Sequence, residues 1–409
     1  MARPPVTADP AADAATVLRR LGFALLFLAL PVLALFGART VVVLGPLAII
    51  ILVLAAALGG GARPVRSQLS TLVLSTRGLA AGLLLLWSVV SLIWTPYPAQ
   101  ATERLINIMG TLVLVLAGYL ALPERTRAAN LYLLPIGVAA AALAGIVLAL
   151  LGDDADPEHA DQTLERGLIV LVLLVWPALA WLRSRNREVE ALLLAVAVTF
   201  AAVLAPVSRP LEGLVIGAFA FALTAARPSL GVAVTAIAMA AVVMLAPLLP
   251  FILTPLAAGA LGGADPLVGG LQAWRTVVAE EPLRLLTGHG FETAFRGRAA
   301  GLIPAEAPRN LLFELWYELG LVGAAALAVA LYAGARRGGR DHPPLVPGLM
   351  ASFASAFALA CLGTATVQMW WLTALAITVL VFVATSRGQF RTTRPKAILQ
   401  MRPTVRPQL

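Results

Sequence analysis

Residues 274–295 read WRTVVAEEPLRLLTGHGFETAF, and residues 307–323 read APRNLLFELWYELGLVG. These two segments form the most polar stretch of a chain that otherwise consists of apolar runs. The first segment combines an amphipathic pattern with Pro282 and a Gly-His-Gly turn. The second segment opens with an Arg-Asn pair and continues as an apolar helix that carries two glutamates. The stretch therefore marks the place where the chain departs from a simple series of hydrophobic spans.

The composition of the whole chain requires a bilayer around it. Of the 409 residues, 60% are hydrophobic and 12% are charged, and the mean hydropathy is +0.89. A soluble domain has about 45–50% apolar and about 25% charged residues, so the surplus apolar side chains have no aqueous core to fill. The net charge of +9 does not indicate nucleic-acid binding, because the basic residues lie in short loops between apolar runs. We therefore predict an all-α integral membrane protein.

Twelve apolar segments are long enough to cross a bilayer. A hydrocarbon core of about 30 Å needs roughly 17–25 helical residues at about 1.5 Å per residue. The eighth segment has the weakest pattern, because Glu212 lies near its start. The predicted spans are residues 21–37, 41–58, 78–95, 105–122, 129–151, 167–182, 190–206, 211–226, 229–250, 311–334, 345–363 and 367–385. They place a transmembrane domain at residues 21–385, with one large outer loop, 251–310, between spans 9 and 10.

The distribution of basic residues predicts the orientation of the spans. With residues 1–20 in the cytoplasm, 21 of the 30 Lys and Arg residues fall on the cytoplasmic side. Basic residues in short loops favour that side of a membrane, whereas long loops carry little weight. Five of the nine remaining basic residues lie in the long loop 251–310. We therefore predict that both termini, including the basic tail 386–409, are cytoplasmic and that the large loop lies outside.

Four arginines lie at the predicted outer ends of spans. Arg166 opens the sixth span, Arg209 lies between the seventh and the eighth, and Arg275 and Arg309 belong to the large loop. Arginine keeps its charge and binds phosphate through two parallel hydrogen bonds, so such a cluster indicates a phosphate or diphosphate ligand. The alternative is that each arginine anchors its span at the lipid headgroups. Arg209 fits that alternative least well, because a serine, a proline and Glu212 surround it in a tight connection.

Two glutamates and a histidine are further candidates for a site. Glu314 and Glu318 are four residues apart and share one face of the tenth helix. A carboxylate within a span needs a partner, so we expect both to pair with outer arginines, either to orient them or as a purely structural ion pair. His289 lies between two glycines as a turn residue or a site residue, and Asn310 is a candidate helix N-cap. No metal-ligand spacing occurs, so no metal and no cofactor is predicted.

The order of these motifs resembles the O-antigen ligase and polymerase family of bacterial inner-membrane enzymes. An arginine-containing amphipathic segment is followed by Pro282 and by the Gly-His-Gly turn at 288–290. Asn310 then precedes a G-x-x-G motif, 320–323, at a spacing similar to the family signature. The Ser-Arg pair that contains Arg209 is similar to a pair that follows an earlier span in the family. The motifs cover about an eighth of the chain, whereas the pattern of spans covers nearly all of it.

The sequence departs from the family at the residue before that asparagine. Members usually have a histidine there that is thought to take part in catalysis, and this chain has Arg309. Arginine does not act as a general base. In one alternative, another group accepts the proton, such as His289, Glu292, Glu306 or Glu314. In a second, no side-chain base is needed and the arginine clamps a phosphate. In a third, the chain is inactive or uses another substrate.

The resemblance implies a metal-independent glycosyltransferase of lipopolysaccharide biosynthesis. Such an enzyme moves a glycan from an undecaprenyl-type polyprenyl diphosphate to a hydroxyl of lipid A–core (a ligase) or of another glycan (a polymerase), on the periplasmic side of the inner membrane. We favour the ligase over the polymerase. A polysaccharide flippase or transporter and a non-catalytic scaffold are the alternatives from other classes. The expected catalytic residues are His289, as the base, with Arg309, Glu314 and Glu318, and the expected diphosphate-binding residues are Arg166, Arg209 and Arg275.

Overall fold

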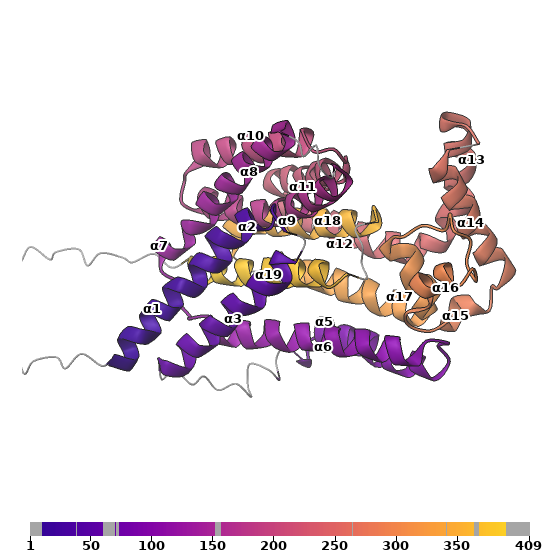
Figure 1. Cartoon of the computed structure of the whole chain (residues 1–409), viewed down its shortest axis with the longest axis horizontal. Helices are drawn as coiled ribbons and strands as arrows, with labels where there is room; N and C mark the ends of the chain where they lie inside the picture. The colour runs from indigo at the N-terminus through magenta and orange to yellow at the C-terminus, as the bar shows by residue number, and fades with distance from the viewer. Residues whose placement is uncertain are drawn as a thin grey trace, which may run out of the picture.

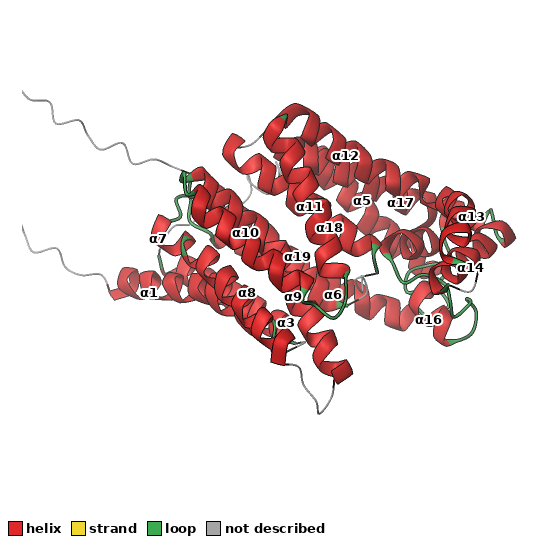
Figure 2. Cartoon of the chain, turned by 90° about the horizontal axis from the view of Figure 1, so that it is seen from above, coloured by secondary structure: helices red, strands yellow, loops and turns green. Residues whose placement is uncertain are grey.

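The computed structural model describes residues 10–389, apart from 38, 60–69, 71–72, 152–156, 264, 341 and 364–367. Within these described residues every regular element is a helix, and eleven helical segments are long and apolar enough to cross a membrane. Figures 1 and 2 show them side by side in an elongated bundle. The prediction of an all-α integral membrane protein is confirmed. Of the predicted terminal segments, residues 1–9 and 390–409 lie outside the described part of the chain.

The helices follow the apolar segments of the sequence. Their bounds are α1 (Pro10–Ala24), η1 (Leu25–Ala29), α2 (Leu30–Leu33), α3 (Thr40–Leu58), α5 (Thr76–Val90), η2 (Ser91–Ile93), α6 (Pro98–Ala121), α7 (Ala128–Leu131), α8 (Leu133–Leu151), α9 (Pro157–Ser184), α10 (Glu188–Val203), α11 (Arg209–Ala226), α12 (Pro228–Leu245), η3 (Ala246–Leu248), α13 (Leu249–Leu261), α14 (Pro266–Glu280), α15 (Arg284–Thr287), α16 (Thr293–Ala299), α17 (Leu311–Gly338), η4 (Pro343–Leu345), α18 (Val346–Cys361) and α19 (Met369–Ser386). Successive segments join end to end, so α1, η1 and α2 form one span, as do α7 with α8.

Two of the predicted spans differ from the structure. The seventh, 190–206, forms α10, whose 16 residues give a length of about 24 Å, short for a full crossing. Proline disfavours helical geometry in the residue before it, and the helix ends at Val203, shortly before Pro206. The ninth, 229–250, continues without a break through α12, η3 and α13 to Leu261. The first part of the predicted loop 251–310 is therefore helix. By length and composition, the described residues contain eleven spans rather than twelve.

Helix α9 forms the centre of the bundle. Its apolar window is 89% buried, against 17–67% for the other spans. Residues 168–182 of this helix are hydrophobic on every side, a pattern typical of a helix that is surrounded by others. It contacts α8, α10, α11, α18 and α19. The remaining spans expose many large apolar side chains, which fit the surrounding lipid.

A buried polar relay joins α9 to α11 and α18. The indole Nε1 of Trp176 donates to Ser355 Oγ at 2.8 Å, and that hydroxyl donates to the carbonyl of Gly213 at 2.7 Å. Small residues let these helices approach closely, and the ring of Trp176 lies directly against Gly217. The contacts of Gly213 with Leu359 and of Gly217 with Ser355 show that α11 and α18 run antiparallel in a fixed register.

Residues 265–310, which we call the cap, lie at the end of the bundle opposite α1 and α7, as Figure 1 shows. Helix α14 starts with Asp265 as its N-cap and ends at Glu280, two residues before Pro282, where the sequence predicts a break. The ring of Trp274 is buried and lies perpendicular to that of Phe313, with 5.8 Å between the centroids. The cap is thereby fastened to α17, the helix that carries both candidate glutamates.

Candidate functional site

Helix α17 is interrupted at Gly320, whose backbone angles (φ 59°, ψ −155°) are not helical. The helix starts at Asn310, and the side chain of this residue accepts a hydrogen bond from the N–H of Phe313 at 2.9 Å, which confirms its prediction as an N-cap. After the kink, residues 321–338 alone measure about 27 Å, close to the thickness of a hydrocarbon core. The first part, 311–319, which holds Glu314 and Glu318, is therefore not needed to cross the membrane.

The backbone carbonyls before the kink are satisfied from outside the helix. A kink removes the helical donors of the preceding turn, and a buried carbonyl without a donor is costly. The N–H of His289 donates to the carbonyl of Tyr317 at 2.8 Å, and the N–H of Gly290 donates to that of Glu318 at 3.0 Å. The indole Nε1 of Trp87 in α5 donates to the carbonyl of Leu319 at 2.9 Å. The Gly-His-Gly turn thus docks on the kink of α17.

Glycine is required on both sides of this contact. Gly288 has φ +74°, and a Cβ there would overlap the carbonyl of Glu318. Gly320 has φ +59°, and a Cβ there would lie 2.6 Å from the backbone nitrogen of Gly288. Positive φ angles of this kind cost little only for glycine. The glycines of the sequence motif are therefore explained by the close approach of two backbones.

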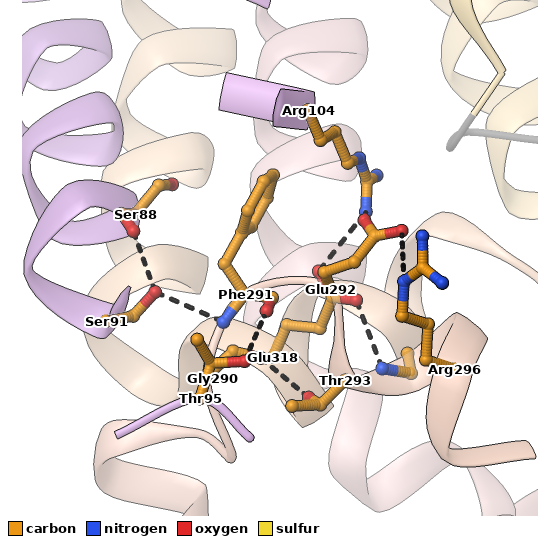
Figure 3. Close-up of polar contacts among 11 residues, drawn as sticks. Ser88, Ser91, Thr95, Arg104, Gly290, Phe291, Glu292, Thr293, Arg296 and Glu318 are labelled. Atoms are coloured by element: carbon orange, nitrogen blue, oxygen red, sulfur yellow. Dashed lines mark hydrogen bonds and ion pairs between the residues drawn. The ribbon is translucent and has the colours of Figure 1, made fainter. Parts of the chain in front are cut away.

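A buried ion cluster lies beside the turn and is drawn in Figure 3. Arg104, in the second turn of α6, places Nη1 2.7 Å from Oε2 of Glu292 and 3.7 Å from Oε2 of Glu318. The side chains are 15%, 6% and 5% exposed respectively. The other oxygen of Glu318 accepts from the N–H of Ala294 at 3.1 Å, and the other oxygen of Glu292 lies 3.7 Å from Nε of Arg296. The cluster therefore joins α6, α16 and α17 through charge.

Polar side chains of η2 and of the loop after it hold the segment that carries Glu292. Ser91 Oγ accepts from the N–H of Phe291 at 3.2 Å, and Thr95 Oγ1 donates to its carbonyl at 2.8 Å. The guanidinium of Arg104 lies 4.7 Å from the centre of the Phe291 ring. Glu292 itself has φ +71°, which is uncommon for a residue with a side chain. Two hydrogen bonds and an ion pair thus fix a strained backbone conformation that aims this carboxylate at Arg104.

Glu314 lies near a second group of arginines. Its side chain is buried, and it attracts the guanidinium of Arg298 electrostatically. Burial lowers the pKa of Arg298 from its ordinary value, Glu314 opposes that shift, and the neighbouring Arg309 adds to it. Nη2 of Arg298 donates to the carbonyl of Pro308 at 2.7 Å. Arg309 is exposed, and it makes no ion pair with any residue that the structure describes.

His289 lies in an aromatic hollow beside α17, on the face that carries Phe313 and Tyr317. Its ring stacks on that of Tyr317 with 4.0 Å between centroids and 9° between planes. Tyr317 in turn stacks on Phe313 at 5.5 Å, and Phe313 meets Trp274 edge to face. Glu281 and other residues of α14 and α15 complete a shallow hollow with about 300 Å³ of empty space, its open mouth included. The hollow thus presents a ladder of aromatic faces next to the imidazole of His289, the carboxylate of Glu281 and the guanidinium of Arg284, whose Nε lies 3.8 Å from that carboxylate.

Both ring nitrogens of His289 face acceptors. Nδ1 lies 3.1 Å from the carbonyl oxygen of Tyr317, and Nε2 lies 3.1 Å from Oε2 of Glu281. A carbonyl only accepts, so Nδ1 carries a proton and the second proton or lone pair of the ring is at Nε2. Nε2 is therefore the ring nitrogen that faces the carboxylate of Glu281.

The remaining predicted arginines lie apart from the ion cluster. Nη1 of Arg209 is 2.9 Å from Oε1 of Glu165, and its side chain is 42% exposed. Arg166 is half-buried in the turn of α9 that holds Glu165, and Arg275 is exposed, with its guanidinium 5.5 Å from the ring centre of Phe251. The register of α11 against α18 puts Arg209 level with Gly363, and a Cβ at Gly363 would contact the carbonyl of Arg309. Arg209 and Arg309 therefore share one end of the bundle.

Sequence reasoning missed two partners in the site, Arg104 and Glu281. The predicted fourth span, 105–122, begins after Arg104, whereas α6 begins at Pro98, which occupies the first helical turn. Proline is favoured at that position, so Pro98 was a usable signal for an earlier start and for a charge inside the helix. Glu281 gives no such signal, because its contact with His289 depends on how the chain turns at Pro282. Within the described residues no group of three or more His, Cys, Asp or Glu side chains is placed to hold a metal ion.

No protein-family model matches the chain, and no curated protein or solved structure matches it either. The fold and the site together define a multi-pass all-α membrane protein with a polar helical cap at one end.

Proposed function

We propose that this protein is a lipid-carrier-dependent glycosyltransferase that resembles O-antigen ligases. The donor is a glycan on a polyprenyl diphosphate, and the acceptor is a sugar hydroxyl of lipid A–core. One observation carries the proposal: the aromatic hollow, with its His289–Glu281 pair, lies against α17, and α17 starts directly after Arg309 and Asn310. A site for this reaction needs a sugar platform, a proton acceptor and a cationic contact for a diphosphate.

Arginines supply the cationic contact in this proposal. Arg309 is exposed without an ion-pair partner in the described residues, Arg298 lies near it, and Arg209 is at the same end of the bundle. A guanidinium stabilises negative charge on a departing diphosphate through paired hydrogen bonds, and a fixed charge at that place lowers the barrier. The arginine in the usual histidine position thus has a role of its own.

The hollow supplies the platform and the base. The apolar face of a sugar ring stacks on aromatic rings such as Tyr317 and Phe313. In the proposed reaction the acceptor hydroxyl takes the place of Glu281 beside Nε2 of neutral His289, and Nε2 takes its proton while that oxygen bonds to the anomeric carbon. The bond between the anomeric carbon and the diphosphate oxygen breaks, and its electron pair leaves with the lipid diphosphate. Glu281 stabilises the imidazolium that forms, and Nδ1 stays bonded to the Tyr317 carbonyl.

The same proposal fixes the topology. We infer that the cap lies on the periplasmic side of a bacterial inner membrane, because the basic short connections lie at the opposite end of the spans. A diphosphate carrier presents its glycan on that side. The polymerase reaction, with a second glycan as the acceptor, uses the same geometry and is the alternative within the family. A knockout separates them: loss of a ligase leaves bare core, whereas loss of a polymerase leaves core with single repeats.

The direct test is transfer by the purified protein in detergent. A labelled polyprenyl-diphosphate glycan is supplied with lipid A–core and with no metal or nucleotide. We expect transfer by the unaltered chain and a loss of roughly tenfold to hundredfold for Arg309→Gln or Arg209→Gln, the range for a charge-assisted hydrogen bond. His289→Gln lowers the rate while donor binding stays the same. His342→Gln, an exposed histidine at the far end of the bundle, is the control.

Three results would contradict the proposal. Absence of any transfer, with the protein folded and donor bound, points to the non-catalytic scaffold. Movement of the labelled donor across a vesicle membrane without a new glycosidic bond points to the flippase. Equal rates for the unaltered protein, Arg209→Ala and Arg275→Ala remove the arginines from the mechanism.

A further inference from the structure

A second hollow lies at the end of the bundle that is far from the cap. It is formed by α1 and by the connection between α6 and α8, two parts of the chain about a hundred residues apart. The space inside it is about 390 Å³, including its opening. Its lining residues are Thr16, Arg19, Arg20, Pro123, Arg125, Arg127 and Asn130. Four of these seven side chains are arginines, and no lining residue that the structure describes is a carboxylate.

The wall that carries Arg125 and Arg127 is held in place by the residue between them. Thr126 is fully buried, and its N–H donates to the carbonyl of Arg387 at 3.1 Å. Nη1 of Arg387 donates in turn to the carbonyls of Tyr119 and Leu122 at the end of α6. Arg125 and Arg127 both line the hollow, and Arg127 precedes α7 with extended backbone angles. The fold thus presents two guanidinium groups to one hollow.

The opposite wall adds two more charges. Arg19 and Arg20 lie on α1, where Arg19 is half-buried and its Nη2 would lie 3.4 Å from a Cβ at Gly59. Arg19, Arg20 and Arg127 bring like charges to one hollow from two walls, and an anion between them reduces their repulsion. Other arginines at this end serve the fold instead: Arg185 donates to the carbonyl of Gly388 and stacks on Trp181. The orientation of a span in the membrane depends only on how many basic residues its cytoplasmic end carries. It does not require that these residues converge on one hollow.

We propose that this hollow binds a phosphate group, either that of an anionic lipid headgroup or a free phosphate or diphosphate. Arg20 directly precedes the apolar part of its span, and Arg125 follows the end of α6 by four residues, so the hollow lies where lipid headgroups meet the protein. Guanidinium groups bind phosphate oxygens in pairs, and the amide of Asn130 and the hydroxyl of Thr16 add neutral contacts. The site is independent of the glycosyl transfer proposed above.

The test measures binding to the purified full-length protein in a neutral detergent by titration calorimetry. The probes are dihexanoyl phosphatidylglycerol, dihexanoyl phosphatidylcholine, inorganic phosphate and inorganic pyrophosphate. The variant Arg19→Gln/Arg127→Gln removes one charge from each wall. The control Arg336→Gln/Arg340→Gln removes two exposed charges from the same end of the bundle but away from the hollow. Asn130→Asp is a second variant that keeps the side-chain shape and places a negative charge in the hollow.

A lipid headgroup is supported by binding that saturates with phosphatidylglycerol and not with phosphatidylcholine, and that weakens roughly thirtyfold in the double variant. Each surface arginine contributes about 1 kcal/mol, which is roughly fivefold in binding. Binding of pyrophosphate or phosphate with the same dependence supports a free phosphate. The proposal is overturned when no phosphate probe binds, or when the control and the double variant weaken binding equally. If the double variant unfolds at a lower temperature than the unaltered protein, the affinity of Asn130→Asp for the phosphate probes is the deciding measurement. Weaker binding in that variant supports the proposal, and unchanged binding overturns it.

Discussion

Replacing Arg104 by alanine tests whether the buried ion cluster holds the cap on the bundle. The substitution leaves Glu318 and Glu292 buried, with side chains 5% and 6% exposed, and removes the cation that is 2.7 Å from one and 3.7 Å from the other. Removal of one partner from a buried pair costs about 3–5 kcal/mol, because an uncompensated charge stays in the interior. The loss is at the lower end here, since Glu292 keeps Arg296 at 3.7 Å. We expect about 3 kcal/mol.

The measurement is the thermal midpoint of the purified protein in detergent. In large domains about 1 kcal/mol lowers the midpoint by roughly 2 °C, so Arg104→Ala lowers it by about 6 °C. Arg296→Ala is the matched control, because Arg296 contacts the same Glu292 but its side chain is 37% exposed. An exposed pair contributes about 1 kcal/mol or less, so the control shifts the midpoint by about 2 °C or less.

A second substitution identifies the cause. Glu318→Gln in the Arg104→Ala background removes the buried charge and keeps the shape of the side chain, so the double variant is more stable than Arg104→Ala alone. Equal midpoints for Arg104→Ala and Arg296→Ala would refute the reasoning. So would a double variant that is less stable than the unaltered protein by the sum of the two single losses, since that additivity means that the two side chains do not interact.

Two further predictions concern the kink of α17. Gly320→Ala destabilises the protein by about 2 kcal/mol or more, because the positive φ is strained for alanine and the added Cβ meets the backbone of Gly288. Gly82→Ala is the control, since its Cβ meets nothing within 4 Å, and it stabilises the protein by about 0.5–1 kcal/mol. Equal midpoints for the two variants would contradict this. Trp87→Phe leaves the Leu319 carbonyl without its donor and costs about 1–3 kcal/mol, with hydrogen exchange at residues 321–323 increased; unchanged exchange would show that the carbonyl has another partner.

The membrane architecture was predictable because lipid imposes one pattern on every span. A helix needs a fixed number of apolar residues to cross about 30 Å, and this requirement is local in the sequence. Where the prediction differs from the structure, a local rule is overridden by proline, as at Pro206 after α10, or by helix continuation, as between α12 and α13. Asn310 was equally accessible, since an N-cap is decided by a few neighbouring residues.

The pairing of charges was not predictable in this way. The contact of Arg104 with Glu318 joins residues more than two hundred positions apart, and it depends on how α6 lies against α17. The sequence pattern indicated only that a carboxylate at position 318 needs a partner. The contact of His289 with Glu281 spans eight residues, yet it depends on the turn after Pro282 and on the kink at Gly320. Tertiary geometry of this kind leaves no periodic signal in the chain.

The structure also sharpens the meaning of Arg309 under the proposed function. Arg309 and Tyr317, on which His289 stacks, are eight residues apart, about 12 Å along a helix axis. A base at His289 therefore acts a considerable distance from the position that the family gives to its histidine. The acceptor hydroxyl then enters through the hollow between α14 and α17, and the diphosphate extends toward the start of α17, where Arg309 lies exposed. A histidine at 309 would supply a second base far from the acceptor and would remove a charge that the leaving group needs. Under the proposed function the arginine therefore has a role of its own and does not stand for a lost catalytic residue.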